Sequence, residues 1–497
     1  MADRRLLGVV LLLGCAVRFA TVARPNDQRS LAPWREADYV AIARSFDREG
    51  LDLFHPRVDW REDTPGYAEM ELPLLPWSGA LLYRIFGPHV QILRLLSALA
   101  SAASLLVFAR LAYRVVPAPG ALLASAAFAA NPLLVTFAGA MQPDELMVLF
   151  TVLSMDALWR WLEGGRGVAL LAASGFAAAA VLAKAIAAYL GFVFGYLVLR
   201  KRGARALTDP QIWLAAALAL LPGVAWYAWA YHFYAWTGLS LGVSNETHAI
   251  SWVLLRHPRR AVMGNLTVEA RDVFVWAGIP LAACAFLLDW RRIEPAVAWL
   301  AAIAVTYLLA LDTSGDFWSF YYHSISVPPA CLLAGFGLAG LYERAARAHV
   351  QRASLLRAAG VGLGVLLIAT SSYRTLRLAR DRDTLPNDFY RCARELAPAV
   401  PSDGRIVVRG GSETDEHGHP VAWNESMAFA WMDRKGFNYP SEKLSIETLD
   451  AIAARGGRFW LSEPTELDDP ALRAQAEQRY RLLARCDGYA LYDLAPR

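Results

Sequence analysis

The sequence predicts a mainly α-helical protein that crosses a membrane many times and carries a small α/β domain near its C-terminus. Of its 497 residues, 56% are hydrophobic and only 19% are charged, whereas soluble domains average about 45–50% apolar and about 25% charged residues. The apolar residues gather in runs close to the roughly 20 residues that cross a bilayer as a helix. From about residue 385 the composition changes, and short runs of strand and helix character alternate.

Eleven apolar runs predict a helical bundle of about eleven spans. They lie at about residues 6–23, 90–115, 119–138, 144–162, 167–183, 185–200, 211–235, 271–289, 295–311, 323–342 and 355–374. No small-residue cleavage site follows the first run, so we interpret it as an uncleaved first helix and not as a signal peptide.

The positively charged residues predict the orientation of these spans. Lysine and arginine lie in every second connection, beginning with Arg4 and Arg5, and cytoplasmic loops carry such an excess. The N-terminus is therefore expected in the cytoplasm. Residues 1–376 are expected to form the membrane domain, with a first outer loop at about 24–89, and residues 377–497 an extracytoplasmic domain. The net charge of +4 follows this topology and does not indicate a nucleic-acid partner.

The first outer loop contains two stretches with apolar residues at helical spacing, 37–46 and 72–86. Long loops are usually functional or disordered, and this one is not of low complexity. Each stretch is predicted to form an amphipathic helix in the membrane interface. Two such helices would hold the acidic residues of the loop at the depth of the lipid headgroups.

The C-terminal region predicts a small α/β domain. Helices are expected at 388–396, 446–454 and 471–483, the second with Ser445 as its N-cap, and strands at 405–409, 458–461 and 489–494. Neither a G-x-G-x-x-G motif nor a P-loop occurs, so nothing favours nucleotide binding. His417 and His419 are interpreted as loop residues.

Two of the five cysteines, Cys392 and Cys486, fall in this C-terminal domain. They are candidates for a disulfide if the domain faces an oxidising compartment. The other three lie in apolar runs and are interpreted as small core residues. No C-x-x-C or histidine–cysteine spacing indicates a metal site.

Asp38, in Trp34-Arg35-Glu36-Ala37-Asp38-Tyr39, is the main catalytic candidate. An aspartate in an outer loop is often only solvated, but this one has aromatic and basic neighbours and lies in a predicted interfacial helix, where charge is costly. A carboxylate there can take the proton of an acceptor hydroxyl as its oxygen attacks. Glu69 and Glu71 follow in the same loop and either favour a helix N-terminus or bind acceptor hydroxyls or a metal.

Cationic and aromatic side chains are also predicted on the outer side. Arg94 and Lys184 either extend to the interface or stabilise the growing negative charge of a leaving phosphate. Asp144 is either a helix-terminal charge or part of the site. The remaining candidates for substrate contacts are Trp34, Arg35, Gln142, Tyr321, Tyr322 and His323.

Over roughly residues 6–345 the chain resembles the GT-C-fold membrane glycosyltransferases. The resemblance is to the bacterial branch related to protein O-mannosyltransferases and to the aminoarabinose transferase of lipid A, families 39 and 83. It rests on the order and spacing of Trp34-Arg-Glu-Ala-Asp38, Glu71-Leu-Pro, Tyr83-Arg-Ile-Phe-Gly87, Arg94-Leu-Leu-Ser, Gln142-Pro-Asp144, Lys184, Tyr321-Tyr-His323 and Pro328-Pro329.

The resemblance implies an enzyme of the bacterial cytoplasmic membrane that moves a sugar from a polyprenyl-phosphate donor to an acceptor on the outer face, with inversion at the anomeric carbon. The resemblance places Asp38 at the catalytic centre. It implies that Arg94 and Lys184 bind the donor phosphate and that Tyr322 and His323 lie on the phosphate side. The chain lacks the adjacent Asp-Glu pair of the eukaryotic mannosyltransferases, since Tyr39 follows Asp38. It also lacks MIR-type repeats, so a protein acceptor is not favoured over a glycan or a lipid.

Two other functions stay open at the level of sequence. A transporter or flippase of lipid-linked glycans would also need many spans, although no inverted repeat with interrupted helices is evident. A non-catalytic subunit could use the C-terminal domain to recruit a partner. The sequence names neither the sugar nor the acceptor, and a divalent metal held by carboxylates also stays open.

Overall fold

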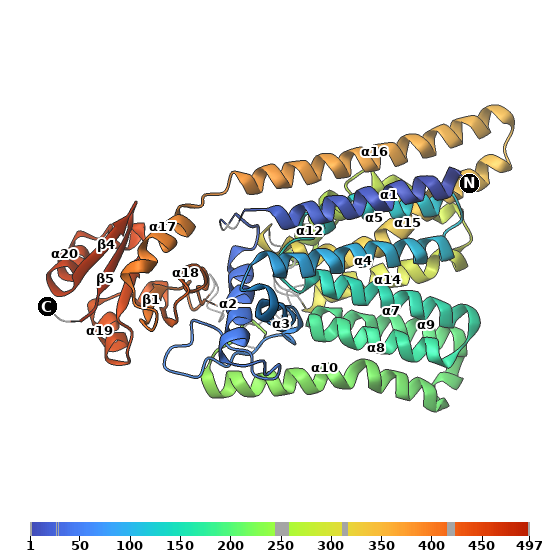
Figure 1. Ribbon diagram of the computed structural model, residues 1–497. Helices are drawn as coiled ribbons and strands as arrows, with labels where there is room; N and C mark the ends of the chain where they lie inside the picture. The colour runs from blue at the N-terminus through green and yellow to red at the C-terminus, as the bar shows by residue number, and fades with distance from the viewer. Residues whose placement is uncertain are drawn as a thin grey trace. The chain divides into compact units, whose positions relative to one another are not determined.

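The computed structural model describes residues 2–25, 27, 29–243, 258–310, 317–414 and 423–495. His417 and His419 lie outside these ranges. The chain divides into two compact units (Figure 1). Unit 1 comprises Met1–Arg24, Arg94–Trp226 and Ile250–Asp381, and unit 2 comprises Pro25–Leu93, Tyr227–Ala249 and Arg382–Arg497.

Unit 1 is helical. Its helices are α1 (Ala2–Ala20), α4 (Gln91–Val115), α5 (Gly120–Ala130), α6 (Pro132–Thr136), α7 (Asp144–Gly164), α8 (Gly167–Ala183), α9 (Leu190–Arg202), α10 (Pro210–Thr237), α12 (Pro258–Val268), α13 (Gly278–Cys284), α14 (Trp290–Ala310), α15 (Val327–Ala346) and α16 (Val350–Asp383). The π-helical turn η5 (Glu269–Val273) and the 3₁₀ segments η2 (Ala185–Tyr189) and η8 (Phe317–Ser326) lie between them. Helices α7 and α8 pack side by side (Figure 1).

Six helices in the described ranges are long and apolar enough to span a membrane, or seven if one bent pair counts as a span. The chain is thus a multi-pass membrane protein, but eleven spans are not confirmed. One reason is visible at the predicted run 119–138. There α5 ends at Ala130, and Asn131 caps a new short helix by accepting hydrogen bonds from the amides of Leu133 and Leu134 at 3.0 and 3.4 Å.

Residues 327–341 of helix α15 are buried on all sides, as expected for a helix that is apolar all round. Its glycines allow other backbones to approach closely. A Cβ atom on Gly335 would lie 2.6 Å from the carbonyl oxygen of Gly120 in α5, and one on Gly337 would lie 1.7 Å from that of Leu281 in α13. Helix α15 is therefore the centre around which unit 1 packs.

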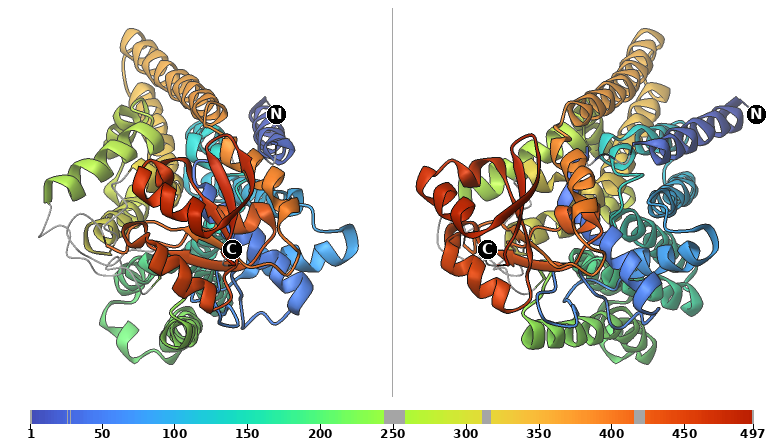
Figure 2. Two further views of the ribbon diagram at one scale, coloured as in Figure 1. Left: turned by 90° about the vertical axis from the view of Figure 1, so that its left-hand side faces the viewer. Right: turned by 60° about the vertical axis from the view of Figure 1, so that its left-hand side comes forward.

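Unit 2 joins the first predicted outer loop to the C-terminal region (Figure 2). Its elements are α2 (Pro33–Glu49), α3 (Leu74–Phe86), α17 (Asp388–Leu396), β1 (Ile406–Arg409), α18 (Met427–Met432), β2 (Gly436–Tyr439), α19 (Ile446–Ala454), β3 (Phe459–Ser462), α20 (Pro470–Arg479), β4 (Arg481–Cys486) and β5 (Tyr489–Asp493).

The five strands form one mixed sheet in the order β2-β1-β3-β5-β4. Strand β1 is parallel to β2 and β3, and β5 is antiparallel to β3 and β4. Val407, Trp460 and Tyr492 lie in register across the sheet and are fully buried. The predicted helices α17 and α19 are confirmed, and Ser445 Oγ accepts the amide of Thr448 at 3.1 Å.

Four parts of this region differ from the prediction. The helix expected over 471–483 ends at Arg479, because Tyr480 is extended and fully buried and leads into β4. Strands β2 and β4 and helix α18 were not predicted from the sequence. Their apolar residues form runs too short to show a clear period.

Helix α2 is not the surface helix expected at 37–46. Residues 36–43 are all buried, because one side of α2 packs on α3 and another on α18, where Ala37 and Ala41 meet Ala430. Helix α3 packs one face on α2 and exposes Leu81, Ile85 and Phe86 on another. The exposed apolar face expected of an interfacial helix is thus present on α3 and absent from α2, and a position in the membrane interface stays a prediction for both.

Candidate functional site

The predicted site residues form two groups, one in each unit. The acidic group, together with Trp34 and Arg35, belongs to unit 2. The cationic and aromatic group, with Gln142 and Asp144, belongs to unit 1.

Asp38 is buried in the first half of α2, with 8% of its surface exposed. Its Oδ1 accepts a hydrogen bond of 2.8 Å from the indole nitrogen of Trp60. Burial raises the pKa of Asp38 to about 6, while the Trp60 hydrogen bond and the charge of Arg35 act in the opposite direction. A carboxylate of this kind is ionised near neutral pH and is a stronger base than an ordinary aspartate.

Glu71 belongs to the same cluster. Its Oε1 accepts a hydrogen bond from the hydroxyl of Tyr39, the residue after Asp38, and its negative charge contributes to the raised pKa of Asp38. Two buried carboxylates therefore lie close together beside α2. The structure thus brings together two of the acidic residues selected from the sequence.

Glu69 has a different setting. Its Oε2 accepts from the hydroxyl of Ser240 at 2.8 Å. Its backbone also bonds to the 239–241 segment, through Leu239 O at 2.9 Å and Leu241 N at 2.9 Å. These contacts favour a structural role for Glu69, in fixing the loop that carries Glu71.

Trp34 and Arg35, one turn before Asp38, also hold neighbouring segments in place. The carbonyl of Trp34 accepts from Ser426 Oγ at 2.7 Å, and Arg35 Nη1 donates to the carbonyl of Leu241 at 3.1 Å. The hydroxyl of Ser426 lowers the pKa of Asp38 further.

Sequence analysis missed Trp60, which donates a hydrogen bond to Asp38, and Ser426, whose hydroxyl favours the charged form of Asp38. Trp60 stands in Val58-Asp-Trp-Arg61, and a tryptophan between charged residues in an outer loop was a usable signal. Ser426 had no comparable signal, because it is distant in sequence and in an unremarked segment.

Lys184 is the centre of the second group. Helix α8 ends at Ala183, and Lys184 takes an extended conformation before η2. Its ammonium nitrogen donates to Asp144 Oδ1 at 2.6 Å and lies 4.5 Å from the ring centres of both Tyr321 and Tyr322. The structure thus brings three predicted residues around one buried cation, Lys184.

Polar atoms near this cation lack partners. Within the described ranges, Oδ2 of Asp144 and both amide atoms of Gln142 are buried without a hydrogen bond. Unsatisfied buried polar atoms are costly. Polar groups of a bound ligand would supply such partners, so these atoms are candidates for ligand contacts.

His323 is fully buried in the same unit. Its Nδ1 lies 2.7 Å from Oε1 of Glu269, and its ring packs 4.5 Å from that of Tyr307. Glu269 begins the π-helical turn η5, and such turns often occur at functional sites. It was not predicted, because neither its segment nor its spacing stands out in the sequence.

Arg94, in the first turn of α4, is buried and donates to the carbonyl of Arg24 at 2.5 Å. This contact places it where the chain leaves α1. Arg94 is therefore not simply extended into the interface, as one of the two sequence-based interpretations had it.

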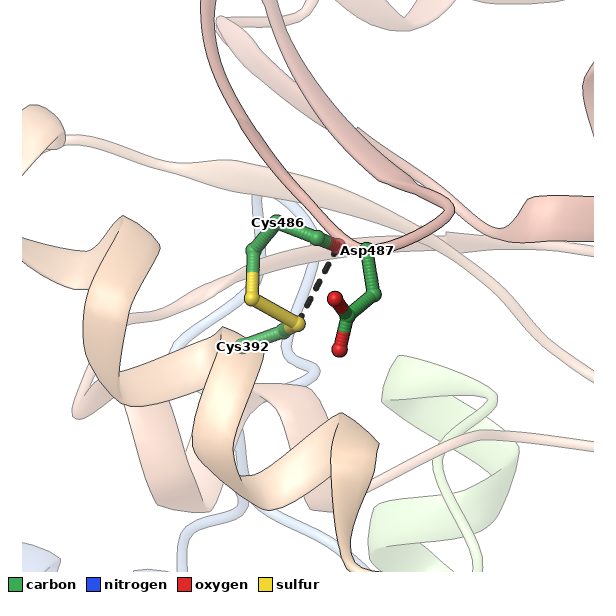
Figure 3. Close-up of side chains that lie close together, drawn as sticks. All are labelled: Cys392, Cys486 and Asp487. Atoms are coloured by element: carbon green, nitrogen blue, oxygen red, sulfur yellow. Dashed lines mark hydrogen bonds between the residues drawn. A yellow bond between two sulfur atoms is a disulfide. The ribbon is translucent and has the colours of Figure 1, made fainter.

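One group of three potential metal ligands occurs among the described residues, Cys392, Cys486 and Asp487. The two cysteines form a disulfide, a pairing that the sequence left open (Figure 3). Asp487 pairs with Arg391. Because the sulfur atoms are bonded to each other, this group is a covalent link between α17 and β4 and not a metal centre.

Comparison with known proteins gives a family match over part of the chain. Residues 64–229 match the model of the dolichyl-phosphate-mannose-protein mannosyltransferase family, which indicates glycosyltransferase activity. No protein with a curated description matches the whole sequence or part of it.

Solved structures match over nearly the full length. ArnT from Cupriavidus metallidurans, bound to undecaprenyl phosphate, has 15% identity and a TM-score of 0.61, covering 98% of this chain and 97% of its own. The oligosaccharyltransferase AglB from Archaeoglobus fulgidus, in complex with an inhibitory peptide and a dolichol-phosphate, has 13% identity and a TM-score of 0.56. The match covers 100% of this chain and 74% of AglB. Arabinofuranosyltransferase AftD from mycobacteria has 14% identity and a TM-score of 0.56. The match covers 99% of this chain and 42% of AftD.

Proposed function

We propose that this chain, a membrane glycosyltransferase with the GT-C fold, moves a sugar from a polyprenyl-phosphate donor to an acceptor hydroxyl with inversion at the anomeric carbon. The family match over residues 64–229 supports the reaction class. Two similar structures contain undecaprenyl phosphate and dolichol-phosphate, and both lipids are polyprenyl phosphates. These bound lipids support a donor of that class here.

The observation that carries the proposal is that Asp38 is buried and accepts a hydrogen bond from the Trp60 indole. In the proposed step Asp38 takes the proton of the acceptor hydroxyl while that oxygen attacks the anomeric carbon. The bond from that carbon to the phosphate oxygen breaks, and its electron pair leaves with the polyprenyl phosphate. A pKa of about 6 suits this role, because the carboxylate is mostly ionised at pH 7 and still basic enough to accept the proton.

The leaving phosphate is assigned to the cations of unit 1. Lys184, with Arg94, stabilises the charge that grows on the phosphate as the bond breaks. In the structure Asp144 and two tyrosine rings hold the Lys184 ammonium in one position, so it need not reorganise during the reaction. Gln142, Tyr321, Tyr322 and His323 are proposed as further donor contacts.

Glu71, Trp34 and Arg35 are assigned to the acceptor side, and Glu69 supports their loop. The proposal routes no step through a metal ion. It adopts the orientation given by the arginine pattern, with the N-terminus in the cytoplasm, the domain at 377–497 outside, and a bacterial cytoplasmic membrane as the location.

Transfer by purified protein in detergent tests the proposal. A panel of radiolabelled polyprenyl-phosphate sugars is offered with an envelope extract as acceptor, to wild type, Asp38→Asn and Lys184→Ala. Asp52→Asn is the matched control, since Asp52 lies in the same loop but is exposed and pairs with His55. Wild type and Asp52→Asn should transfer sugar, and Asp38→Asn should not.

Full activity of Asp38→Asn would show that another residue takes the proton of the acceptor hydroxyl, and Glu71 would be the next residue to test. If no donor on the panel is consumed, the transferase proposal fails. Flipping of lipid-linked sugars in proteoliposomes then becomes the next assay.

A further inference from the structure

Unit 2 contains a polar cavity of about 270 Å³ that the transfer chemistry does not use. It is lined by side chains from α2, α17 and α18 and from the connection after α3: Arg44, His89, Gln91, Tyr390, Arg394 and Trp431. Its volume is near the lower limit of small-molecule pockets, about 300 Å³.

The charge of this cavity is positive. No carboxylate is among its lining residues, whereas two guanidinium groups and a histidine are. Arg44 is held in place by donating to the carbonyl of Ala430 at 2.5 Å. Arg394 donates to the hydroxyl of Tyr390 at 3.1 Å and forms no ion pair with any residue that the structure describes. Arg44 also pairs with Asp433 at 3.6 Å. Arg394 is therefore the lining cation that an anionic group would meet without a competing carboxylate.

The cavity also offers aromatic surface. Tyr390 and Trp431 meet edge to face with ring centres 5.1 Å apart. The indole nitrogen of Trp431 is buried and has no hydrogen-bond partner among the described atoms. Such rings combine an apolar face with a polar edge, which matches the apolar ring face and the hydroxyls of a sugar.

A neighbouring cavity of about 420 Å³ gives a useful contrast. It is lined by residues of both signs, which satisfy one another: Arg48 pairs with Asp433 at 2.8 Å, and Lys435 with Glu49 at 2.7 Å. These two cations are therefore neutralised within the protein. The smaller cavity thus has the stronger claim as an anion site.

We propose that the cavity at Arg394, Tyr390 and Trp431 binds an anionic sugar, one that bears a phosphate or a carboxylate. The binding itself rests on the geometry of the cavity. Its assignment as a subsite for the acceptor glycan rests on the proposed transferase function. The anion would meet Arg394, and the sugar ring would lie against the two aromatic rings, where the Trp431 indole donates to a hydroxyl.

Calorimetric binding to the full-length protein in neutral detergent tests this inference. The probes are glucose 6-phosphate, glucuronate, glucose and inorganic phosphate. We expect one or both anionic sugars to bind more tightly than glucose and than phosphate alone, and the better of the two identifies the anion. Arg394→Gln should weaken binding by about tenfold or more, through loss of a charge-assisted hydrogen bond. Trp431→Phe, which keeps a ring and loses the donor, should weaken it less.

Arg473→Gln is the matched control, because Arg473 is exposed on α20 and does not line the cavity. Equal binding of the anionic sugars by wild type and Arg394→Gln would overturn the inference. It would also be overturned if glucose or inorganic phosphate bound as tightly as the anionic sugars, or if none of the probes bound. The measurement uses no donor lipid, and Asp38→Asn should bind the probes normally. Failure here and failure of the transferase proposal are therefore distinguishable.

Discussion

The indole nitrogen of Trp60 donates a 2.8 Å hydrogen bond to Oδ1 of Asp38, across 22 residues of sequence. The bond holds the carboxylate in one orientation and stabilises its charged form, while burial favours the neutral form. The balance of these two effects sets the basicity of Asp38, and it gives the first three predictions.

Transfer should depend on pH through Asp38. If this carboxylate is the base, kcat/KM should fall about tenfold per pH unit below a pKa of about 6 and level off above it. Asp38→Asn should lower kcat/KM by at least about 100-fold at pH 7.5. A pH–rate profile of wild type and Asp52→Asn checks this, and a flat profile between pH 5 and 7 would contradict it.

Trp60→Phe should move this profile to higher pH. The substitution keeps an aromatic ring but removes the donor that stabilises the carboxylate, so the pKa of Asp38 should rise by about one unit. Trp77→Phe is a matched control, because the Trp77 indole donates at 3.0 Å to a backbone carbonyl, Leu51 O, in the same unit. An unchanged profile in Trp60→Phe would show that the bond does not set the pKa.

Ionised Asp38 should also cost stability. Its folded-state pKa of about 6 lies above the unfolded value of 3.8, so its favourable contribution is fully present below about pH 4 and is lost as the pH rises through 6. A shift of about two units corresponds to roughly 3 kcal/mol. Asp38→Asn should therefore melt above wild type at pH 8, with a smaller difference at pH 4.5. Melting curves at both pH values measure this, and a difference that grows toward acid pH would refute it.

Lys184→Ala should impair the use of donor. Removing a cation that stabilises a leaving phosphate typically costs about 100-fold or more in rate, and Lys184→Arg should restore part of the loss. Lys201→Ala is the control, since the Lys201 ammonium bonds to backbone carbonyls, at 2.7 Å for Leu162. Kinetics with varied donor concentration report the effect, and equal losses in Lys184→Ala and Lys201→Ala would argue against a specific role.

Gly335→Ala should loosen the centre of unit 1. The added methyl group would lie 2.6 Å from the carbonyl oxygen of Gly120, so α5 and α15 must separate, at a cost of about 1–3 kcal/mol. Gly175→Ala on α8, where a Cβ meets nothing within 4 Å, should be nearly neutral. Thermal unfolding in detergent compares the two variants, and equal midpoints would show that the contact is not tight.

Several local features were predictable from sequence because they depend on neighbouring residues. Helices α17 and α19 have the bounds that their apolar period and the Ser445 cap indicate. The number of spans was less accessible. Hydropathy measures composition over a window, and it does not register a break such as the cap at Asn131.

The sequence by itself determined that the chain is a multi-pass membrane protein of the GT-C class with a C-terminal α/β region, since hydropathy, period and motif order are properties of contiguous residues. It also selected Asp38, Glu71, Lys184 and Asp144 by residue type. Only the tertiary structure decided their partners. In the folded chain Glu71 accepts a hydrogen bond from Tyr39, whereas Glu69 accepts one from Ser240, 171 residues away. Lys184 pairs with Asp144 across 40 residues. Such pairs form because packing brings distant segments together, and no local pattern encodes which buried polar group will meet which.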